Sequence, residues 1–315
     1  MIDIIIVNWN AGFHVVQALV SIADHSDQLV RSVIVVDNAS TDGSLKAIEA
    51  HAAVLNLPLK CIVNAENRGF AAACNQGAKL ATSDTLLFLN PDVMLFRGSL
   101  RAPFAYLSAP DNADVGAVGI QLVDRHDRVS RSCARFPNFA SFAMQSLALT
   151  HIPQLRRFGM HMSDWAHDTT QDVDHVIGAF LMIRKPLFDQ LNGFDERFFV
   201  YLEDLDLSLR IKQAGQRIVY LTQARAFHLG GGTSHQVKAH RLFYALRSRM
   251  VYGAKHFVPW QARALVITIC IAEPIARFAR ALFNLNLADA RNCASAFRML
   301  YRDAPTIWAT LRGRS

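Results

Sequence analysis

Residues 2–8 have the sequence IDIIIVN, and residues 32–37 have the sequence SVIVVD. Both are short, largely apolar runs rich in β-branched residues, which is typical of strands buried on both faces of a sheet. Strand and helix patterns alternate around them, at residues 13–23, 44–55, 59–63, 69–81 and 85–89. This order predicts an α/β fold with a mostly parallel, doubly wound sheet.

Further along the chain the pattern is less regular. We expect strands at residues 115–123, 176–184 and 218–221, the last extended by Ala226 and Phe227. Residues 130–165 give no regular pattern and are expected to form loops. From about residue 241 to the end, only helices are expected, with breaks at Pro259, Pro274 and Pro305.

The composition is that of a globular protein with a substantial core. Of 315 residues, 51% are hydrophobic and 19% are charged, which excludes a disordered or collagen-like chain. The five cysteines are scattered singly, which predicts free thiols in a reducing compartment instead of a disulfide framework. The N-terminus lacks a signal-peptide pattern, because Asp3 interrupts the apolar run. We therefore expect a cytoplasmic protein.

The net charge of +7 belongs to the C-terminal part of the chain. Residues 1–235 contain 20 Lys and Arg against 23 Asp and Glu, whereas residues 236–315 contain 13 against 3. This shift predicts a catalytic domain at 1–235 and a basic helical extension at 236–315. A basic extension requires an anionic partner, either nucleic acid or an anionic lipid surface.

The apolar run of this extension, residues 264–272, is too short to cross a membrane, since a spanning helix needs about 20 residues. Arginines mixed with phenylalanines and leucines follow it, which favours amphipathic helices lying in a membrane interface. The alternative is that these helices pack on the catalytic domain and expose a solvated arginine face. Nucleic-acid binding is disfavoured, because the extension has no recognition or base-stacking motif.

Three polar residues, Asp37, Asn67 and Asp92, follow predicted strands at the edge where such sheets bind ligands. A carboxylate at Asp37 could accept hydrogen bonds from a nucleobase, or it could cap the next helix. Asp92, in the segment Asn90-Pro91-Asp92, could hold Mg²⁺ or Mn²⁺ against a diphosphate, although the same segment also suits a simple turn. His228 precedes the glycine-rich residues 230–232, so it is a candidate metal or phosphate ligand; a core histidine is the alternative.

The segment FDERFFVYLEDLDLSLR, residues 194–210, combines five carboxylates with aromatic side chains. A helix is expected from Glu203, with Asp206 and Arg210 spaced for an ion pair. Carboxylates at a helix start could merely complement the helix dipole. Apolar neighbours would instead place Glu203 or Asp204 in a partly dry site, where a carboxylate can act as a general base.

Together these segments resemble family 2 glycosyltransferases of the GT-A fold, and within them the rhamnosyltransferase-like branch that builds bacterial cell-surface polysaccharides. The matching stretches are IIIVNWN, VVDNASTDGS, NRGFAAACNQG, LFLNPDV, GAFLMIRK, GFDERFFVYLEDLDLSLR and HLGGGTS. They occur in the family's order and span residues 2–234, about three quarters of the chain.

The resemblance implies a role for each matching residue. Asp37 would bind the nucleotide base, with Asn8, Asn67 and Arg68 lining the donor site. Asp92 would ligate a divalent metal, Mg²⁺ or Mn²⁺, as the second carboxylate of the family's Asp-x-Asp motif. Asn90 replaces the first carboxylate of that motif, as is usual in this branch. His228 would be a further metal or diphosphate ligand. In the Glu-Asp pair, Asp204 would be the catalytic base and Glu203 would orient the acceptor.

The implied activity is inverting transfer of a sugar, L-rhamnose from dTDP-rhamnose, to a lipid-linked or polysaccharide acceptor at the inner face of the cell membrane. A UDP-sugar is the alternative donor, and an inactive nucleotide-sugar or lipid-surface binding module is the alternative class. A nucleotidyltransferase is disfavoured, since it would need a glycine-rich basic loop after the first strand, where this chain has residues 7–10, VNWN.

Overall fold

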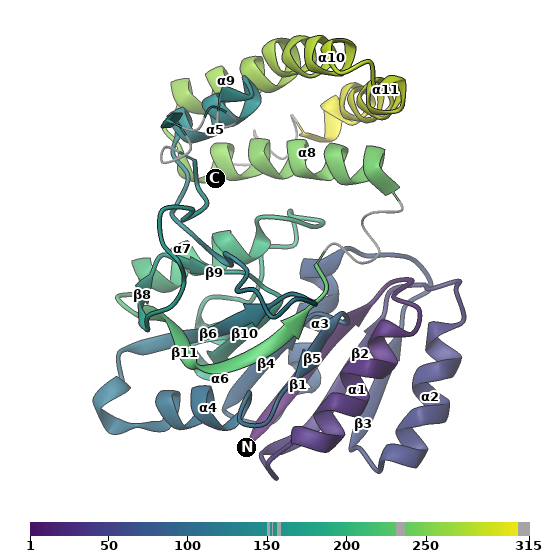
Figure 1. Cartoon of the computed structure of the whole chain (residues 1–315), viewed down its shortest axis with the longest axis vertical. Coiled ribbons are helices and arrows are strands. Elements are labelled where there is room, and N and C mark those ends of the chain that lie inside the picture. The colour runs from purple at the N-terminus through teal and green to yellow at the C-terminus, as the bar shows by residue number, and fades with distance from the viewer. Residues whose placement is uncertain (150–151, 153, 156–158, 231–236, 308–315) are drawn as a thin grey trace. The chain divides into compact units, whose positions relative to one another are not determined.

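The structure, a computed structural model, describes residues 1–149, 152, 154–155, 159–230 and 237–307 (Figure 1). The chain forms two compact units. Unit 1 consists of residues 1–135, 165–196 and 203–233, and unit 2 of residues 136–164, 197–202 and 234–315. The division expected at residue 235 corresponds to the last of these boundaries. Residues 136–164 and 197–202, which were expected in the first domain, group with the C-terminal helices.

Unit 1 is built on a nine-stranded mixed sheet with the order β3-β2-β1-β4-β10-β6-β11-β5, in which β8 also pairs with β11. The strands are β1 (Ile2–Asn8), β2 (Val30–Asp37), β3 (Leu59–Val63), β4 (Thr85–Leu89), β5 (Val93–Leu95), β6 (Val115–Val123), β8 (Gln171–Val173), β10 (Phe180–Arg184) and β11 (Arg217–His228). Strands β1 to β4 run parallel, as do β6 and β11. Strand β10 is antiparallel to both β4 and β6. The predicted mostly parallel α/β sheet is confirmed.

Helices cover both faces of this sheet. They are α1 (His14–His25), α2 (Ser44–Leu55), α3 (Phe70–Leu80), α4 (Arg101–Ser108), the 3-10 turn η1 (Pro110–Asn112), α6 (Lys185–Gln190) and α7 (Glu203–Gln213). Alternate residues of β1 point to opposite faces, so Ile4 and Ile6 pack with Leu19 of α1. Ile5 faces Gly77 of α3, where a Cβ atom would lie 2.6 Å from Ile5 Cγ2.

The predicted strand at 176–184 is interrupted in the structure. A short strand β9 (His175–Val176) pairs with β7 (Cys133–Ala134) in a separate two-stranded sheet, and β10 starts only at Phe180. The residues between them, Ile177 to Ala179, form a turn that brings Gly178 close to α7. Periodicity could not reveal this break, because residues 176–183, VIGAFLMI, form one unbroken apolar run across it.

Unit 2 is helical: α5 (Phe139–Ser146), α8 (Lys238–His256), α9 (Pro259–Ile267), the π-helical turn η5 (Thr268–Ala272), α10 (Glu273–Phe283) and α11 (Leu287–Arg302). The all-helical C-terminal part was predicted, whereas α5 was expected to be a loop. Its sequence signal is a reciprocal capping box: Asn138 accepts from the Ser141 amide, and Ser141 accepts from the Asn138 amide.

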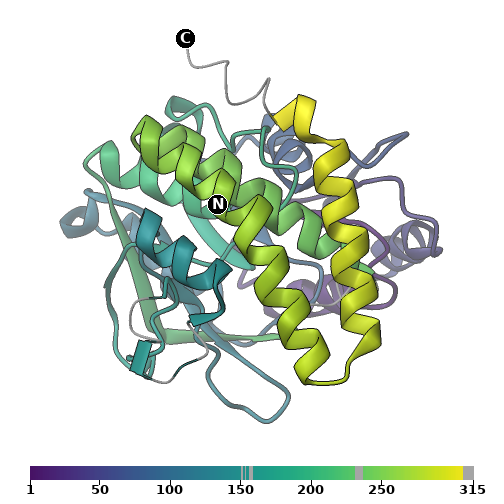
Figure 2. The ribbon, with the colours of Figure 1, turned by 90° about the horizontal axis from the view of Figure 1, so that it is seen from above.

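The expected break at Pro274 is wrong. Helix continues from α9 through η5 into α10, and Figure 2 shows this long rod with α11 beside it. Pro274 has no N–H to donate to the carbonyl of Cys270, four residues earlier. The Tyr301 hydroxyl of α11 donates to that carbonyl at 2.7 Å. The π-helical turn and this substitute donor explain why the proline is tolerated.

A buried ion-pair cluster joins three helices of unit 2. Arg249 of α8 donates to both carboxylate oxygens of Glu273 of α10, at 2.7 and 2.6 Å, and to Ser146 of α5 at 3.2 Å. Arg277 shares the same carboxylate at 2.7 Å. The side chain of Glu273 is fully buried, so removing either buried partner would leave an uncompensated charge.

Among the described residues, no helix is both long enough and apolar enough to cross a membrane. All five cysteines are free; Cys74, Cys133 and Cys293 are buried, as expected of free thiols, whereas Cys61 is exposed.

Asp3 is a buried carboxylate at the opposite end of β1 from Asn8. It accepts hydrogen bonds from the Ser32 hydroxyl at 2.6 Å and from the amides of Thr82 and Ser83 at 2.6 and 2.8 Å. Burial alone would raise the pKa of Asp3, but these donors outweigh it and hold the pKa below its usual value of 3.8. The carboxylate thus ties β2 and the α3–β4 turn to β1.

We expect Asp3→Asn to lower the free energy of unfolding by about 1–3 kcal/mol at neutral pH, because it leaves a buried donor without its acceptor. The lowered pKa makes this contribution present above about pH 4 and lost as pH falls further, since the unfolded chain binds the proton first. Urea unfolding at several pH values measures this difference. Asp111→Asn, at an exposed carboxylate, should change stability little; equal losses for both variants would contradict the prediction.

Candidate active site

The carboxyl ends of β1 and β2 lie side by side in register, with Asn8 opposite Asp37. The Asn8 amide donates to one oxygen of Asp37 at 2.7 Å and to Ser44 at 2.8 Å, and the other Asp37 oxygen accepts from the Ser40 amide at 3.1 Å. Asp37 is only 1% exposed. It therefore shapes the turn after β2. It does not cap α2, whose N-cap residue is Gly43.

Asn38 connects this turn to the loop after β3. Its carbonyl oxygen accepts from the side chain of Asn64 at 3.0 Å and from the Arg68 amide at 3.2 Å. Its amide donates to Asn67 at 3.0 Å and to the Gly69 carbonyl at 3.1 Å. The predicted donor-site residues Asn67 and Arg68 are thus held beside Asp37. Sequence reasoning missed Asn38, although an amide next to a strand-end carboxylate was a visible signal.

Asp92 and His228 come together although 135 residues separate them in the chain. Strand β5 follows Asp92 directly and pairs antiparallel with the end of β11, which places His228 opposite Val93. Asp92 Oδ1 and His228 Nε2 lie 3.5 Å apart, with side chains 9% and 12% exposed. The Leu229 amide donates to the Asp92 carbonyl at 3.2 Å. The glycine-rich segment that sequence reasoning added here, residues 231–234, lies outside the described residues.

Asp204 lies in the first turn of α7. One carboxylate oxygen, Oδ2, accepts from the Gly178 amide at 2.8 Å and lies 3.7 Å from His175 Nε2. The other ring nitrogen of His175 is 3.0 Å from the Ser208 hydroxyl. Asp204 Oδ1 accepts from the Leu205 amide at 2.8 Å. The carboxylate is therefore held from two sides, and its side chain is 17% exposed.

The close approach to Gly178 leaves little room for a side chain there. A Cβ atom at Gly178 would lie 3.2 Å from Asp204 Oδ2 and 3.3 Å from Asp204 Cβ. His175 was not among the predicted site residues. The sequence signal that could have revealed His175 is its own position: a histidine stands directly before the residues Val-Ile-Gly, where a buried strand would normally have an apolar residue.

Glu203 faces the core, away from the exposed side of Asp204. It is 5% exposed, and its Oε2 atom has no hydrogen-bond partner among the described residues. Burial, together with the charge of Asp204, raises the pKa of Glu203 well above its usual value. The sequence placed Glu203 or Asp204 in a partly dry site, and the acceptor-orienting role that the resemblance implies for Glu203 stays a prediction. The predicted ion pair between Asp206 and Arg210 is present at 2.8 Å.

Backbone bonds place Asn90 and Asp204 on either side of one turn. The Asn90 amide donates to the Ala179 carbonyl at 2.9 Å, while Gly178 donates to Asp204. The polar network around Asp37, the pair Asp92–His228 and the fixed carboxylate of Asp204 all lie in unit 1. This arrangement can bind a polar ligand beside a carboxylate able to accept a proton.

The chain belongs to glycosyl transferase family 2, whose sequence model matches residues 3–191. It is 26% identical over 272 residues to the N-acetylglucosaminyl-diphospho-decaprenol L-rhamnosyltransferase of Mycobacterium tuberculosis, covering 82% of this chain and 86% of that protein. It is 27% identical over 177 residues to the rhamnosyltransferase WbbL of Escherichia coli, covering 56% and 63%. The predicted resemblance to rhamnosyltransferase-like glycosyltransferases is confirmed.

Solved structures support the GT-A fold. A mannosyltransferase from Pyrobaculum calidifontis, in complex with GDP-Man and Mn²⁺, superposes with a TM-score of 0.55 at 19% identity, covering 98% of this chain and 84% of that one. TarS of Staphylococcus aureus, in complex with UDP-GlcNAc, gives a TM-score of 0.54 at 15% identity, with coverages of 96% and 92%. At these identities the likeness concerns the fold.

Proposed function

We propose that this glycosyltransferase transfers L-rhamnose from dTDP-rhamnose to a lipid-linked or polysaccharide acceptor in bacterial cell-surface glycan synthesis, with inversion at the anomeric carbon. The observation that carries the proposal is the Asp204 carboxylate, held by the Gly178 amide on the same unit as the strand-end polar residues. The names of the two rhamnosyltransferases that resemble the chain support the sugar and the acceptor class.

The proposed mechanism needs one base and no covalent nucleophile. Asp204 removes the proton of the acceptor hydroxyl as that oxygen attacks the anomeric carbon and displaces the nucleoside diphosphate. Each oxygen of Asp204 already accepts an amide hydrogen bond, but a carboxylate has about four lone-pair directions, so capacity for the acceptor remains. His175, supported by Ser208, keeps the carboxylate in one orientation. Fixed orientation is itself a large part of catalysis.

On the donor side, Asp37 and Asn8 are already bonded to each other and buried. We therefore propose that this buried pair fixes the conformation of the turn after β2, and that this turn forms part of the nucleotide site. The exposed Arg68, beside Asn67, would face the nucleotide or its diphosphate. Asn90 would contribute through its position at the end of β4.

A divalent cation, Mg²⁺ or Mn²⁺, fits the pair Asp92 and His228, which offers one carboxylate oxygen and one imidazole nitrogen 3.5 Å apart. The described residues contain no group of three or more such side chains. Two protein ligands suit a cation that completes its coordination with substrate phosphates and water. When bound, the cation would neutralise charge on the departing diphosphate.

Two alternatives remain open to test. A UDP-sugar donor is favoured by the solved complex of TarS, which contains UDP-GlcNAc. An inactive nucleotide-sugar or lipid-surface binding module is disfavoured. Binding alone does not require both a carboxylate fixed by the Gly178 amide at Asp204 and the pair Asp92–His228.

The location follows from the acceptor. Because the proposed acceptor is lipid-linked and the cysteines are free, we propose that the protein is cytoplasmic and attaches to the inner face of the cell membrane. Exposed apolar residues form a stripe along α9, η5 and α10: Trp260, Ile267, Ile271, Ile275 and Leu282, each 58–66% exposed. Their spacings of 7, 4, 4 and 7 residues put them on one side of a helix. With the basic charge of residues 236–315, this side suits an anionic membrane interface.

Metal and donor binding can be measured together. We expect Mn²⁺, followed by electron paramagnetic resonance, to bind more tightly when dTDP is present, and dTDP to support this better than UDP. Asp92→Ala and His228→Ala should each weaken Mn²⁺ binding by about tenfold or more, because each removes a ligand. His126→Ala, at an exposed histidine of the same unit, is the control. Unchanged binding in both variants would show that the metal site lies elsewhere, and a preference for UDP would overturn the rhamnose assignment.

The base assignment is tested by Asp204→Asn, which keeps the size of the side chain but removes its proton-accepting oxygen. Turnover should fall about a hundredfold or more, while donor affinity, measured by titration, stays nearly unchanged. Glu203→Gln is the matched variant: it replaces the neighbouring buried carboxyl, whose raised pKa favours the neutral form, by a neutral amide, and it should retain most activity. If Glu203→Gln is inactive and Asp204→Asn is active, the two roles must be exchanged.

Membrane contact is tested by flotation with anionic liposomes. The full chain should float, and flotation should decrease as salt rises, because salt screens the attraction between basic residues and lipid. Ile271→Glu combined with Ile275→Glu should reduce binding about tenfold or more, since it places charge in the apolar stripe. Val54→Glu, at an exposed apolar residue of α2, is the control. Equal flotation of all three proteins would refute this docking surface.

A further inference from the structure

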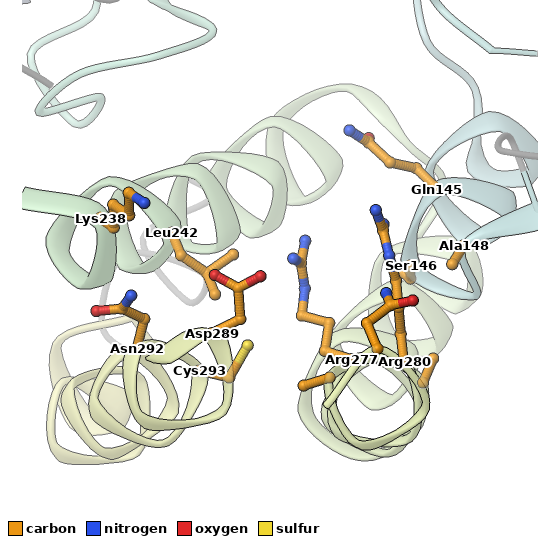
Figure 3. Close-up of a pocket in the computed structure, with 13 residues that line it drawn as sticks. Gln145, Ser146, Ala148, Lys238, Leu242, Arg277, Arg280, Asp289, Asn292 and Cys293 are labelled. Carbon is orange, nitrogen blue, oxygen red and sulfur yellow. The ribbon is translucent and has the colours of Figure 1, made fainter. Parts of the chain in front are cut away.

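Unit 2 contains an open pocket of about 290 Å³, lined by polar and apolar side chains of α5, α8, α10 and α11 and of the residues that follow α5 and α10 (Figure 3). This volume lies near the lower end of the range for small-ligand sites, about 300–1,000 Å³. Arg277 and Arg280 enter the pocket from α10, and Asp289 and Cys293 lie across from them on α11. Neither the base nor the strand-end residues of unit 1 contribute to it.

The pocket carries an excess of positive charge. Lys238, Arg277 and Arg280 line it, against the single carboxylate of Asp289 among the lining residues. Arg277 is paired with Glu273, but Glu273 also neutralises the buried Arg249, so one carboxylate serves two guanidinium groups. The fixed charge around the pocket therefore favours an anion.

The remaining polar lining supplies neutral hydrogen-bond donors. The side-chain amides of Gln145 on α5, Asn284 directly after α10 and Asn292 on α11 line the pocket. Asp289 is held to Asn286, whose amide donates to it at 2.9 Å, so part of its accepting capacity is used at the start of α11. Guanidinium and amide donors arranged around a small space match the oxygens of a phosphate.

Exposed apolar side chains adjoin the pocket in the chain. Leu282, Phe283, Leu285 and Leu287 are 65–89% exposed, and they alternate in sequence with the lining residues Ala281, Asn284 and Asp289. These side chains lie at the end of α10, in the connection to α11 and at the start of α11, and the same stretch carries the lining residue Asn284. A free phosphate ion makes no apolar contact, whereas a phosphate esterified to a hydrocarbon chain would bind the pocket with its head group and contact exposed apolar side chains of this stretch with its chain.

We propose that this pocket binds the phosphate or diphosphate group of a membrane lipid. The proposal extends the membrane contact described above from a general attraction to a specific head-group site. It can be tested in solution, so its failure is distinguishable from failure of the transferase activity or of membrane docking.

Farnesyl diphosphate, a soluble diphosphate with a short hydrocarbon chain, is the probe, and binding to the full chain is measured by calorimetry without divalent metal. Inorganic pyrophosphate and farnesol test the two parts of the probe separately. Farnesyl diphosphate should bind more tightly than either. Arg280→Gln and Lys238→Gln should each weaken it about tenfold, the scale of one lost hydrogen bond to a charged group.

Two further variants test whether removing negative charge strengthens binding and supply a control. Asp289→Asn removes the opposing charge and should strengthen binding, whereas Arg291→Gln, an exposed arginine of α11 outside the pocket, should leave it unchanged. Thermal unfolding of each variant confirms that it is folded. If all four variants bind the probe like the parent chain, the pocket is not the site. If pyrophosphate binds as tightly as farnesyl diphosphate, the lipid assignment is overturned.

Discussion

The direction of the strands is the constraint on which the arrangement of unit 1 depends. Because β1, β2, β3 and β4 run parallel, their carboxyl ends must all lie at one edge of the sheet, and Asn8, Asp37 and Asn90 lie there with them. The antiparallel strand β10 begins where β4 ends, so the turn before it joins the same edge. Through that turn, Gly178 connects the edge to Asp204 on α7.

The fold of unit 1 could largely be predicted, because buried parallel strands are continuous apolar runs and the polar turns between them are distinct. Prediction failed where the decisive information was not periodic. The break between β9 and β10 is caused by pairing with β7, which is far away in sequence. Helix α5 depends on a capping box, and helix persists through Pro274 because Tyr301 supplies a distant donor. Such contacts are invisible to a pattern along one segment.

The residues of the site likewise divide into those that the sequence pattern revealed and those that it did not. Strand ends gave the positions of Asp37, Asn67 and Asp92, and sheet register explains why His228 meets Asp92. Asn38 and His175 were missed because their importance lies in what they hold: the loop at residues 64–69 for the first, and the Asp204 carboxylate for the second. A residue that positions another one carries no sequence signature of its own. The acceptor-orienting role of Glu203 stays a prediction, although its side chain is buried.

The burial of Glu203 also affects the charge that the proposed donor would meet. A carboxyl group enclosed by the core and next to another carboxylate favours its protonated, neutral form. The Glu-Asp pair then presents one negative charge to its surroundings, where the sequence suggests two. A nucleoside diphosphate is itself an anion, and repulsion between like charges is strong at short range in a partly dry site. A hidden carboxyl that favours its neutral form would therefore limit the repulsion between the proposed donor and the site that contains Asp204.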